Sequence, residues 1–371
     1  MSILNHFNSI IPTVDQKNAA EKLEQFINDD SHVFILQGYA GTGKTTLLKT
    51  LIEYLKAQQL LFSALAPTGR AAKILRDKTG TGSTIHSAIY DFLNLESINK
   101  DAEDEADQSF HYYFPINNLD ASNRQIIIVD EASMVSNKES KHELFTFGTN
   151  VLLNDLLTYA ALKTTKNKII FVGDPAQLPP VGDSASKALD ARFFEEKGLE
   201  VQQAVLKEIK RQSNNLIVEN GAKIRDLIES EKRTLFNFNF DSSTFRKIDN
   251  DDVISKYTEL YAKPEIGDGV IISFTNQQCY QYNQAIRSRY FPNQQHVVPG
   301  DLLLINNNNY HTYGVKLFNG DIVKVINAHS DVEVQKTPVW CEEDGKKIRK
   351  IIEIQFRKFT IRTADHPEEV E

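Results

Sequence analysis

The sequence contains little cysteine and no long apolar run. Its two cysteines, Cys279 and Cys341, lack partners at metal-ligand spacing, so we expect free thiols and neither a disulfide framework nor a zinc site. No stretch approaches the ~18 consecutive apolar residues of a membrane span. The first twenty residues carry polar groups throughout, unlike a secretory signal. These absences predict a soluble, cytoplasmic protein without a membrane partner.

Positive charge is not in excess either. The chain has 42 Lys and Arg against 50 Asp and Glu, a formal net charge of −8. This balance excludes a protein coated in positive potential, although a local basic cleft remains compatible with it. Nucleic acid, if it binds, is therefore expected in a groove. With 371 residues, 41% of them hydrophobic, the chain can bury a sizeable core and is long enough for two or three domains.

The first half of the chain alternates apolar strands with helical segments. Helices are expected at 44–58 and 69–78, and strands at 33–37, 61–66, 126–130 and 168–173. This alternation predicts an α/β fold with a parallel sheet covered by helices on both faces. Between Ile89 and Asn123 an acidic run and the aromatic sequence HYYFP interrupt the pattern and predict a small insertion at the edge of the sheet. HYYFP is either edge packing or a pin on which bases stack.

The second half has a different texture. After about Glu195 a second α/β unit is expected, with a helix at 214–228, a strand at 269–274 (GVIISF) and a helix at 276–290. From Gly300 onward, short β-like segments separated by Asn, Gly and Asp predict a small β-rich, SH3-like module. The predicted domains are 1–195, including the insertion at 89–123, then 196–295 and 296–371.

The sequence from Gly38 to Thr45, GYAGTGKT, matches the pattern G-x-x-x-x-G-K-[ST] between a predicted strand and a predicted helix. In this context the backbone N–H groups and the helix N-terminus bind phosphate. Lys44 is expected to reach the β- and γ-phosphates, and the Thr45 hydroxyl to bind Mg²⁺. A glycine-rich turn with an exposed lysine is the structural alternative. The expected ATP-binding residues here are Gly38, Ala40, Gly41, Thr42, Gly43, Lys44, Thr45 and Thr46, with ATP and Mg²⁺ as cofactors.

Two further polar sites follow predicted strands. Asp130 and Glu131 end the strand at 126–130, where parallel sheets place their ligands. Asp130 is expected to hold Mg²⁺ through water, and Glu131 to take a proton from the attacking water. Gln177, in GDPAQLPPV, would point into the same crevice and contact the γ-phosphate or position the water. A proline-braced turn with an exposed Gln177 explains the residues equally well.

The motifs GYAGTGKTT, APTGRAA, STIHSAIY, VDEASM, GDPAQLPPV and LKEIKRQ resemble, in order and spacing, those of superfamily one DNA helicases. They are most similar to the 5′-to-3′ branch, which is Dda- and RecD-like. The resemblance covers roughly residues 13–330. It implies two RecA-like domains, hydrolysis of ATP, and movement along single-stranded DNA or a single-strand/duplex junction.

The resemblance also implies residue roles. Gln16 corresponds to the adenine-reading glutamine, Gln177 to the γ-phosphate sensor and Arg211 to an arginine that approaches the γ-phosphate from the second domain. The implied catalytic residues are Lys44, Glu131, Gln177 and Arg211, and the implied DNA-binding residues are Pro67, Thr68, Thr84 and His86. The residues themselves leave other roles open: an exposed turn for Gln16, a surface charge for Arg211, a helix cap for Thr84 and packing for His86.

Two late motifs of the family are missing between Pro264 and Glu371, namely T-x-H-K-[SA]-Q-G and Y-V-[AG]-[LV]-[ST]-R. The resemblance therefore implies an incomplete second RecA-like domain and a truncated helicase. It leaves open an ATP-gated nucleic-acid-binding module that does not unwind, and an accessory ATPase subunit of a helicase–nuclease complex. A P-loop kinase is disfavoured, because GDPAQLPPV and STIHSAIY have no evident use in one.

Overall fold

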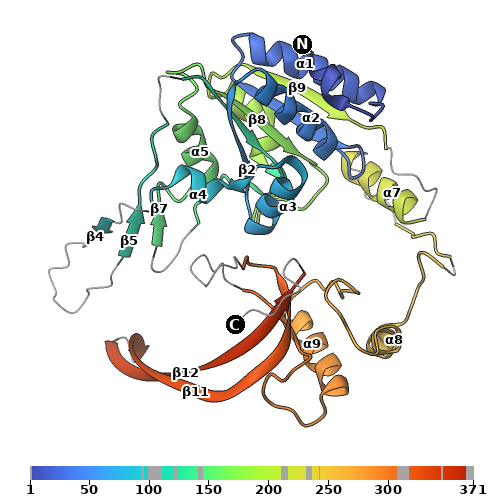
Figure 1. The fold of residues 1–371 in the computed structure, drawn as a ribbon, viewed down its shortest axis with the longest axis vertical. Helices are drawn as coiled ribbons and strands as arrows, with labels where there is room; N and C mark the ends of the chain where they lie inside the picture. Colours follow the sequence, from blue (N-terminus) through green and yellow to red (C-terminus); the bar gives the residue numbers. More distant parts are fainter. Residues whose placement is uncertain are drawn as a thin grey trace. The chain divides into compact units, whose positions relative to one another are not determined.

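The chain divides into two compact units, Met1–Thr244 and Phe245–Glu371. Figure 1 shows a computed structural model of the protein. It describes residues 2–92, 96–98, 111–119, 123–140, 145–209, 216–230, 236–241, 243–306, 317–343 and 346–364. The three-domain division expected from the sequence stays a prediction.

The first unit is built on a six-stranded sheet with the strand order β3-β2-β6-β8-β1-β9, in which all neighbours are parallel. The strands are β1 (Val33–Gly38), β2 (Leu61–Ala66), β3 (Ser83–Thr84), β6 (Gln125–Val129), β8 (Lys168–Gly173) and β9 (Val201–Leu206). The predicted α/β P-loop sheet is confirmed. Its two edge strands, β3 and β9, were not predicted.

Helices cover both faces of this sheet (Figure 1). Alternate residues of a strand point to opposite faces, so Phe34 and Leu36 enter one core while Val33 and Ile35 enter the other. The first core includes α1 (Val14–Asn28), α2 (Lys44–Ala57) and α3 (Gly69–Thr79). The second includes α4 (Ile85–Ile89), α5 (Leu152–Ala160) and α6 (Ala191–Glu195). Short 3₁₀ helices occur at η1 (Ile3–Phe7), η2 (Ala132–Met134) and η3 (Lys187–Leu189).

The predicted insertion contributes to a separate three-stranded sheet of β4 (Glu96–Ile98), β5 (His111–Phe114) and β7 (Phe145–Phe147). The aromatic HYYF sequence forms β5, and Phe114 stacks on Phe147 with ring centroids 4.8 Å apart. Tyr90 anchors the cluster, because its hydroxyl donates to Asp155 Oδ2 at 2.7 Å. Aromatic residues of β5 and β7 therefore pack against one another, as expected for packing at the edge of the sheet. The acidic run lies outside the described residues.

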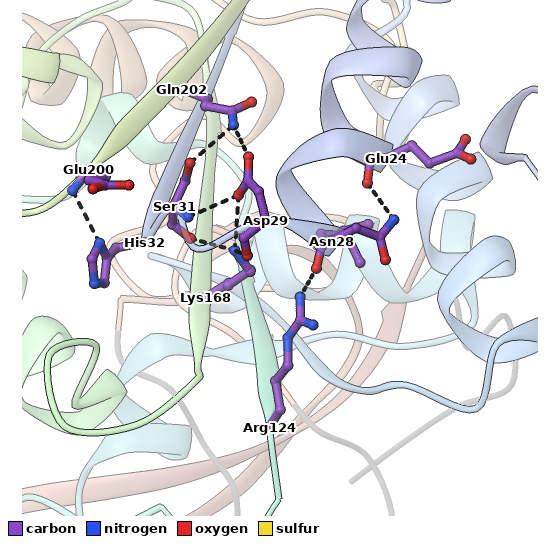
Figure 2. A network of polar contacts seen from close by, with 10 residues as sticks. Glu24, Asn28, Asp29, Ser31, His32, Arg124, Lys168, Glu200 and Gln202 are labelled. Carbon is purple, nitrogen blue, oxygen red and sulfur yellow. Dashed lines mark hydrogen bonds and ion pairs between the residues drawn. The ribbon is translucent and has the colours of Figure 1, made fainter.

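A polar network joins the amino ends of β1, β8 and β9, at the edge of the sheet away from the P-loop (Figure 2). Lys168 Nζ donates to the carbonyl oxygens of Asp29, at 2.7 Å, and Ser31. Gln202 Nε2 donates to the Asp29 carboxylate and, at 3.0 Å, to Ser31 Oγ. Burial lowers the pKa of Lys168, an effect that the Asp29 charge opposes. Lys168 and Gln202 therefore tie the starts of β8 and β9 to the turn that precedes β1.

The second unit contains η4 (Asn250–Asp252), α8 (Val253–Leu260), α9 (Asn276–Tyr290) and a three-stranded antiparallel sheet. The sheet consists of β10 (Leu302–Leu304), β11 (Ile322–Glu343) and β12 (Lys346–Thr363). Arg287 of α9 pairs with Asp301, Nε to Oδ1 at 2.9 Å, and so ties the helix to the sheet. The predicted β-rich module is confirmed, but β11 and β12 form one long hairpin instead of short segments.

The expected strand at 269–274 is not formed. Val270, Ile272 and Phe274 are 76%, 90% and 97% exposed, and no described strand pairs with this segment. An apolar run needs a neighbouring strand to satisfy its backbone hydrogen bonds and cover its side chains, so the sequence pattern alone was insufficient. The incomplete second RecA-like domain stays an expectation. Across the described ranges, no helix has the length and apolarity needed to cross a membrane.

Candidate active site

The P-loop connects the end of β1 to the start of α2. Gly41 and Gly43 have φ of 84° and 83°, a left-handed conformation that favours glycine. A Cβ at Gly43 would lie 2.2 Å from Gln16 Nε2, and one at Gly38 would lie 2.9 Å from Lys44 Cγ. The loop is therefore packed too closely for side chains at these positions. This is the bare backbone that a bound phosphate requires.

Lys44 lies among the charges at the ends of three neighbouring strands. Its Nζ donates to the carbonyl oxygens of Gly38, at 2.6 Å, and Tyr39, at 3.1 Å. Burial lowers the pKa of Lys44, while the carboxylates at the ends of β6 and β8 (Asp174, Glu131 and Asp130) act to raise it. The structure thus places the P-loop lysine within electrostatic reach of all three acids.

Asp130 and Glu131 follow β6 directly. Asp130 Oδ1 accepts a hydrogen bond from the Glu131 backbone N at 3.0 Å. Burial, with a further contribution from the neighbouring Glu131 charge, raises the pKa of Asp130 to about 6. Glu131 has φ 51° and ψ 40°, a left-handed conformation that costs a non-glycine residue about 1–2 kcal/mol. Such backbone strain concentrates at functional sites.

Gln177 lies in the loop after β8 and is exposed. Asp174, which is 2% exposed, organises this loop: its Oδ1 accepts from the Ala176 backbone N at 3.0 Å, and its carbonyl accepts from Gln177 N at 3.1 Å. Gln177 Oε1 accepts from Ser133 Oγ at 3.4 Å. This contact joins the GDPAQ loop to the segment that carries Glu131. The role of Gln177 as γ-phosphate sensor stays a prediction.

Gln16 is buried against the P-loop. It forms a capping box with Thr13 at the start of α1, in which its Oε1 accepts from Thr13 N at 3.0 Å. Its Nε2 donates to the Thr42 carbonyl at 3.1 Å. Both ends of the amide therefore bond to the chain's own backbone, and the side chain is not in an exposed turn. The adenine-reading role stays a prediction.

Asp15, which precedes Gln16, was not among the predicted site residues. Its Oδ2 accepts from the backbone N of Lys207, at 2.8 Å, and of Glu208, at 2.9 Å. The first turn of α1 therefore holds both the P-loop and the segment that follows β9. Arg211, a few residues further on, lies outside the described residues.

The implied DNA-binding residues lie at the ends of β2 and β3, which are adjacent because Ala66 pairs with Thr84. Thr68, next to Pro67, caps α3 by accepting from Ala71 N at 3.2 Å, and Thr84 caps α4 by accepting from Ser87 N at 3.1 Å.

His86 packs against the rings of Tyr90 and Phe147, with centroids 5.5 and 5.6 Å away. Burial lowers the pKa of His86, with Asp155 opposing the change. Capping and packing are thus observed for these residues, and contact with DNA stays a prediction.

The residues present fit a magnesium nucleotide. Mg²⁺ is usually held by one or two carboxylates together with phosphate oxygens and water. Thr45 in the first turn of α2 and Asp130 directly after β6 would supply such oxygen ligands at the same edge of the sheet. Among the described residues there is no group of three or more His, Cys, Asp or Glu side chains that could hold a metal without a nucleotide.

Sequence reasoning missed Asp174, Ser133 and Asp15. Asp174 could have been found, because it directly follows a buried strand at the edge where ligands bind. Ser133 and Asp15 have no local signal, since their significance depends on contacts between segments far apart in the chain.

Comparison with known proteins gives a family and several distant relatives. A family model described as an AAA domain matches residues 13–233. The chain is similar to the ATP-dependent DNA helicase dda of Enterobacteria phage T4, at 26% identity over 326 residues, which cover 85% of this chain and 67% of that protein. It is also similar to the RecBCD enzyme subunit RecD of Buchnera aphidicola subsp. Schizaphis graminum, at 26% identity over 281 residues, covering 71% of this chain and 41% of that one.

A similar solved structure is Bacteroides sp. Pif1 in complex with ADP-AlF4, with a TM-score of 0.40 and 16% identity, covering 96% of this chain and 82% of that one. The family model spans more than half of this chain and includes every strand of the central sheet. The chain therefore belongs to the AAA domain family and is a distant relative of the 5′-to-3′ superfamily one DNA helicases.

Proposed function

We propose that this chain couples ATP hydrolysis to movement along single-stranded DNA, as a helicase or translocase that runs 5′-to-3′. The observation that carries the proposal is the convergence of Lys44, Asp130 and Glu131 at the carboxyl ends of β1 and β6, the two strands that flank β8. The similarity to a protein named as an ATP-dependent DNA helicase favours a helicase or translocase over other functions of P-loop proteins.

In this proposal the backbone of the P-loop binds the phosphates, and Lys44 exchanges its bonds to the Gly38 and Tyr39 carbonyls for bonds to phosphate oxygens. Thr45, directly, and Asp130, through water, would hold Mg²⁺, which would supply positive charge to offset that of the phosphates. Glu131 orients the attacking water and accepts its proton.

A direct backbone contact supports coupling between the nucleotide and the DNA. The Asp130 backbone N donates to the Leu65 carbonyl at 2.9 Å. Leu65 lies two residues before Pro67, in the strand β2 that pairs with both β3 and β6. Displacement of the Asp130–Glu131 turn on hydrolysis would therefore be transmitted to the β2 and β3 ends, where Pro67 and Thr84 are proposed to contact the DNA backbone.

The steady-state rate of ATP hydrolysis, measured with and without a single-stranded oligonucleotide, tests the proposal. Hydrolysis is expected to require Lys44 and to respond to DNA, and Lys44→Ala serves as the inactive control. Lys49→Ala is a matched control, because Lys49 lies on the same helix but is exposed. Hydrolysis that survives Lys44→Ala would contradict the assignment. ATP-dependent DNA binding without hydrolysis would favour the ATP-gated binding module.

A further inference from the structure

An arginine outside the P-loop stacks on it. Arg225 belongs to α7 (Leu216–Ser230), which follows the central sheet in the chain but belongs to the same compact unit. Its guanidinium carbon lies 3.8 Å from the centroid of the Tyr39 ring. Tyr39 is the second residue of the loop, and its carbonyl accepts a hydrogen bond from Lys44. The contact is a cation–π stack that places a permanent positive charge beside the phosphate-binding loop.

The surroundings of Arg225 leave part of its hydrogen-bonding capacity unused. Its Nε is buried and has no hydrogen-bond partner in the part of the chain that the structure describes. A buried N–H without a partner destabilises the protein until an acceptor reaches it. Stacking occupies the face of the guanidinium and leaves its edge, where the N–H groups lie, able to donate.

The position of Arg225 also raises the local positive charge. Lys44 donates to the carbonyl of Tyr39, the residue on whose ring Arg225 stacks, so the two cations lie on either side of one loop residue. Two neighbouring cations repel each other, so an anion between them would be stabilised by both. A planar guanidinium suits phosphate oxygens because it can donate two parallel hydrogen bonds.

We propose that Arg225 contacts the phosphates of the nucleotide bound by the P-loop, with the Tyr39 ring as the platform that holds its guanidinium. This inference rests on the proposed nucleotide-binding function and extends it to a residue outside the loop. Phosphate is a better partner than the adenine ring, because it is an anion that compensates the permanent charge of the guanidinium, whereas adenine is neutral, and because one face of the Tyr39 ring is already covered.

The test is the affinity of the full chain for Mg·ATP, Mg·ADP and adenosine, measured by competition with a fluorescent nucleotide. Arg225→Gln is expected to weaken ATP binding at least tenfold, ADP binding less, and adenosine binding less than twofold. Tyr39→Leu should reproduce this order, and Tyr39→Phe, which keeps the ring, should stay within twofold of the parent. Lys223→Gln, which removes a different cation from α7, should also stay within twofold.

Several outcomes would overturn the inference. If the parent binds Mg·ATP and Arg225→Gln binds it within twofold, Arg225 is a packing contact only. An equal loss of affinity for ATP and adenosine would indicate that Arg225 contacts the base or maintains the conformation of the loop, and does not contact the phosphates. If Arg225→Gln does not fold, as judged by circular dichroism, the affinities of Tyr39→Leu and Tyr39→Phe for the three ligands test the inference. Tyr39→Leu binding ATP within twofold of the parent would then overturn it. Failure of the parent to bind Mg·ATP would instead refute the proposed function.

Discussion

Replacing Asp130 with asparagine is expected to stabilise the metal-free protein. The half-buried carboxyl has its pKa raised from 3.8 to about 6 by burial and by the Glu131 charge. At about 1.4 kcal/mol per pKa unit, keeping this group ionised costs the folded state about 3 kcal/mol at pH 8. Asparagine carries no charge and retains an oxygen that can accept the Glu131 N–H. The substitution should therefore raise the free energy of unfolding at pH 8 by about 1–3 kcal/mol.

The sign of the pH dependence follows from the direction of the shift. Because the pKa of Asp130 is higher in the folded state, that state binds more protons than the unfolded chain between pH 6 and pH 3.8. The Asp130 contribution to the stability of the parent therefore improves as the pH falls through this window. The Asp130→Asn side chain does not titrate, so the advantage of the variant should be largest at pH 8 and should vanish near pH 4.

Thermal unfolding in EDTA, at pH 8 and at pH 4.5, measures both effects. A change of 1 kcal/mol shifts the midpoint by about 2–4 °C in a domain of this size, so a rise of several degrees is expected at pH 8. Glu139→Gln is a control, because Glu139 is an exposed acid near the same turn. A variant that is no more stable than the parent at pH 8, or one whose advantage is the same at both pH values, would refute this account of Asp130.

Four other perturbations have defined outcomes. Lys44→Ala should abolish productive ATP binding because it removes a charge-assisted contact with the phosphates; affinity within threefold of the parent would disprove the P-loop assignment. Glu131→Gln should retain Mg·ATP binding and lower turnover about 10²–10⁴-fold, and unchanged turnover would remove Glu131 from its role. Lys168→Ala should reduce the free energy of unfolding by about 1–3 kcal/mol, since several acceptors lose their buried donor, and urea unfolding should show this without a change in nucleotide affinity. Single-stranded DNA binding should weaken with salt and depend little on sequence, as backbone contacts do; a titration with a strong preference for one sequence would contradict the proposed interface.

The sequence predicted those parts of the site that follow from strand order. Lys44, Asp130 and Gln177 each follow an apolar run, and parallel strands bring their carboxyl ends to one edge, so their proximity needed no knowledge of side-chain contacts. The stacking of Arg225 on Tyr39 could not be predicted in this way, because the partners are far apart in the chain.

The fold outside the central sheet was less predictable for the same reason. β9 contains polar glutamines and is a strand because β1 offers it an edge. The apolar GVIISF segment has the composition of a strand but lacks a described neighbour and stays unpaired. The length of the β11–β12 hairpin depends on pairing that short-range patterns do not encode.

The central claim is that ATP hydrolysis moves this chain along DNA in one direction. Displacement of streptavidin from biotin at either end of a single-stranded oligonucleotide measures it most directly. The account predicts ATP-dependent displacement from the 3′ end, little from the 5′ end, and none with Lys44→Ala. Displacement from the 5′ end, or none from either end while ATP is hydrolysed, would contradict it.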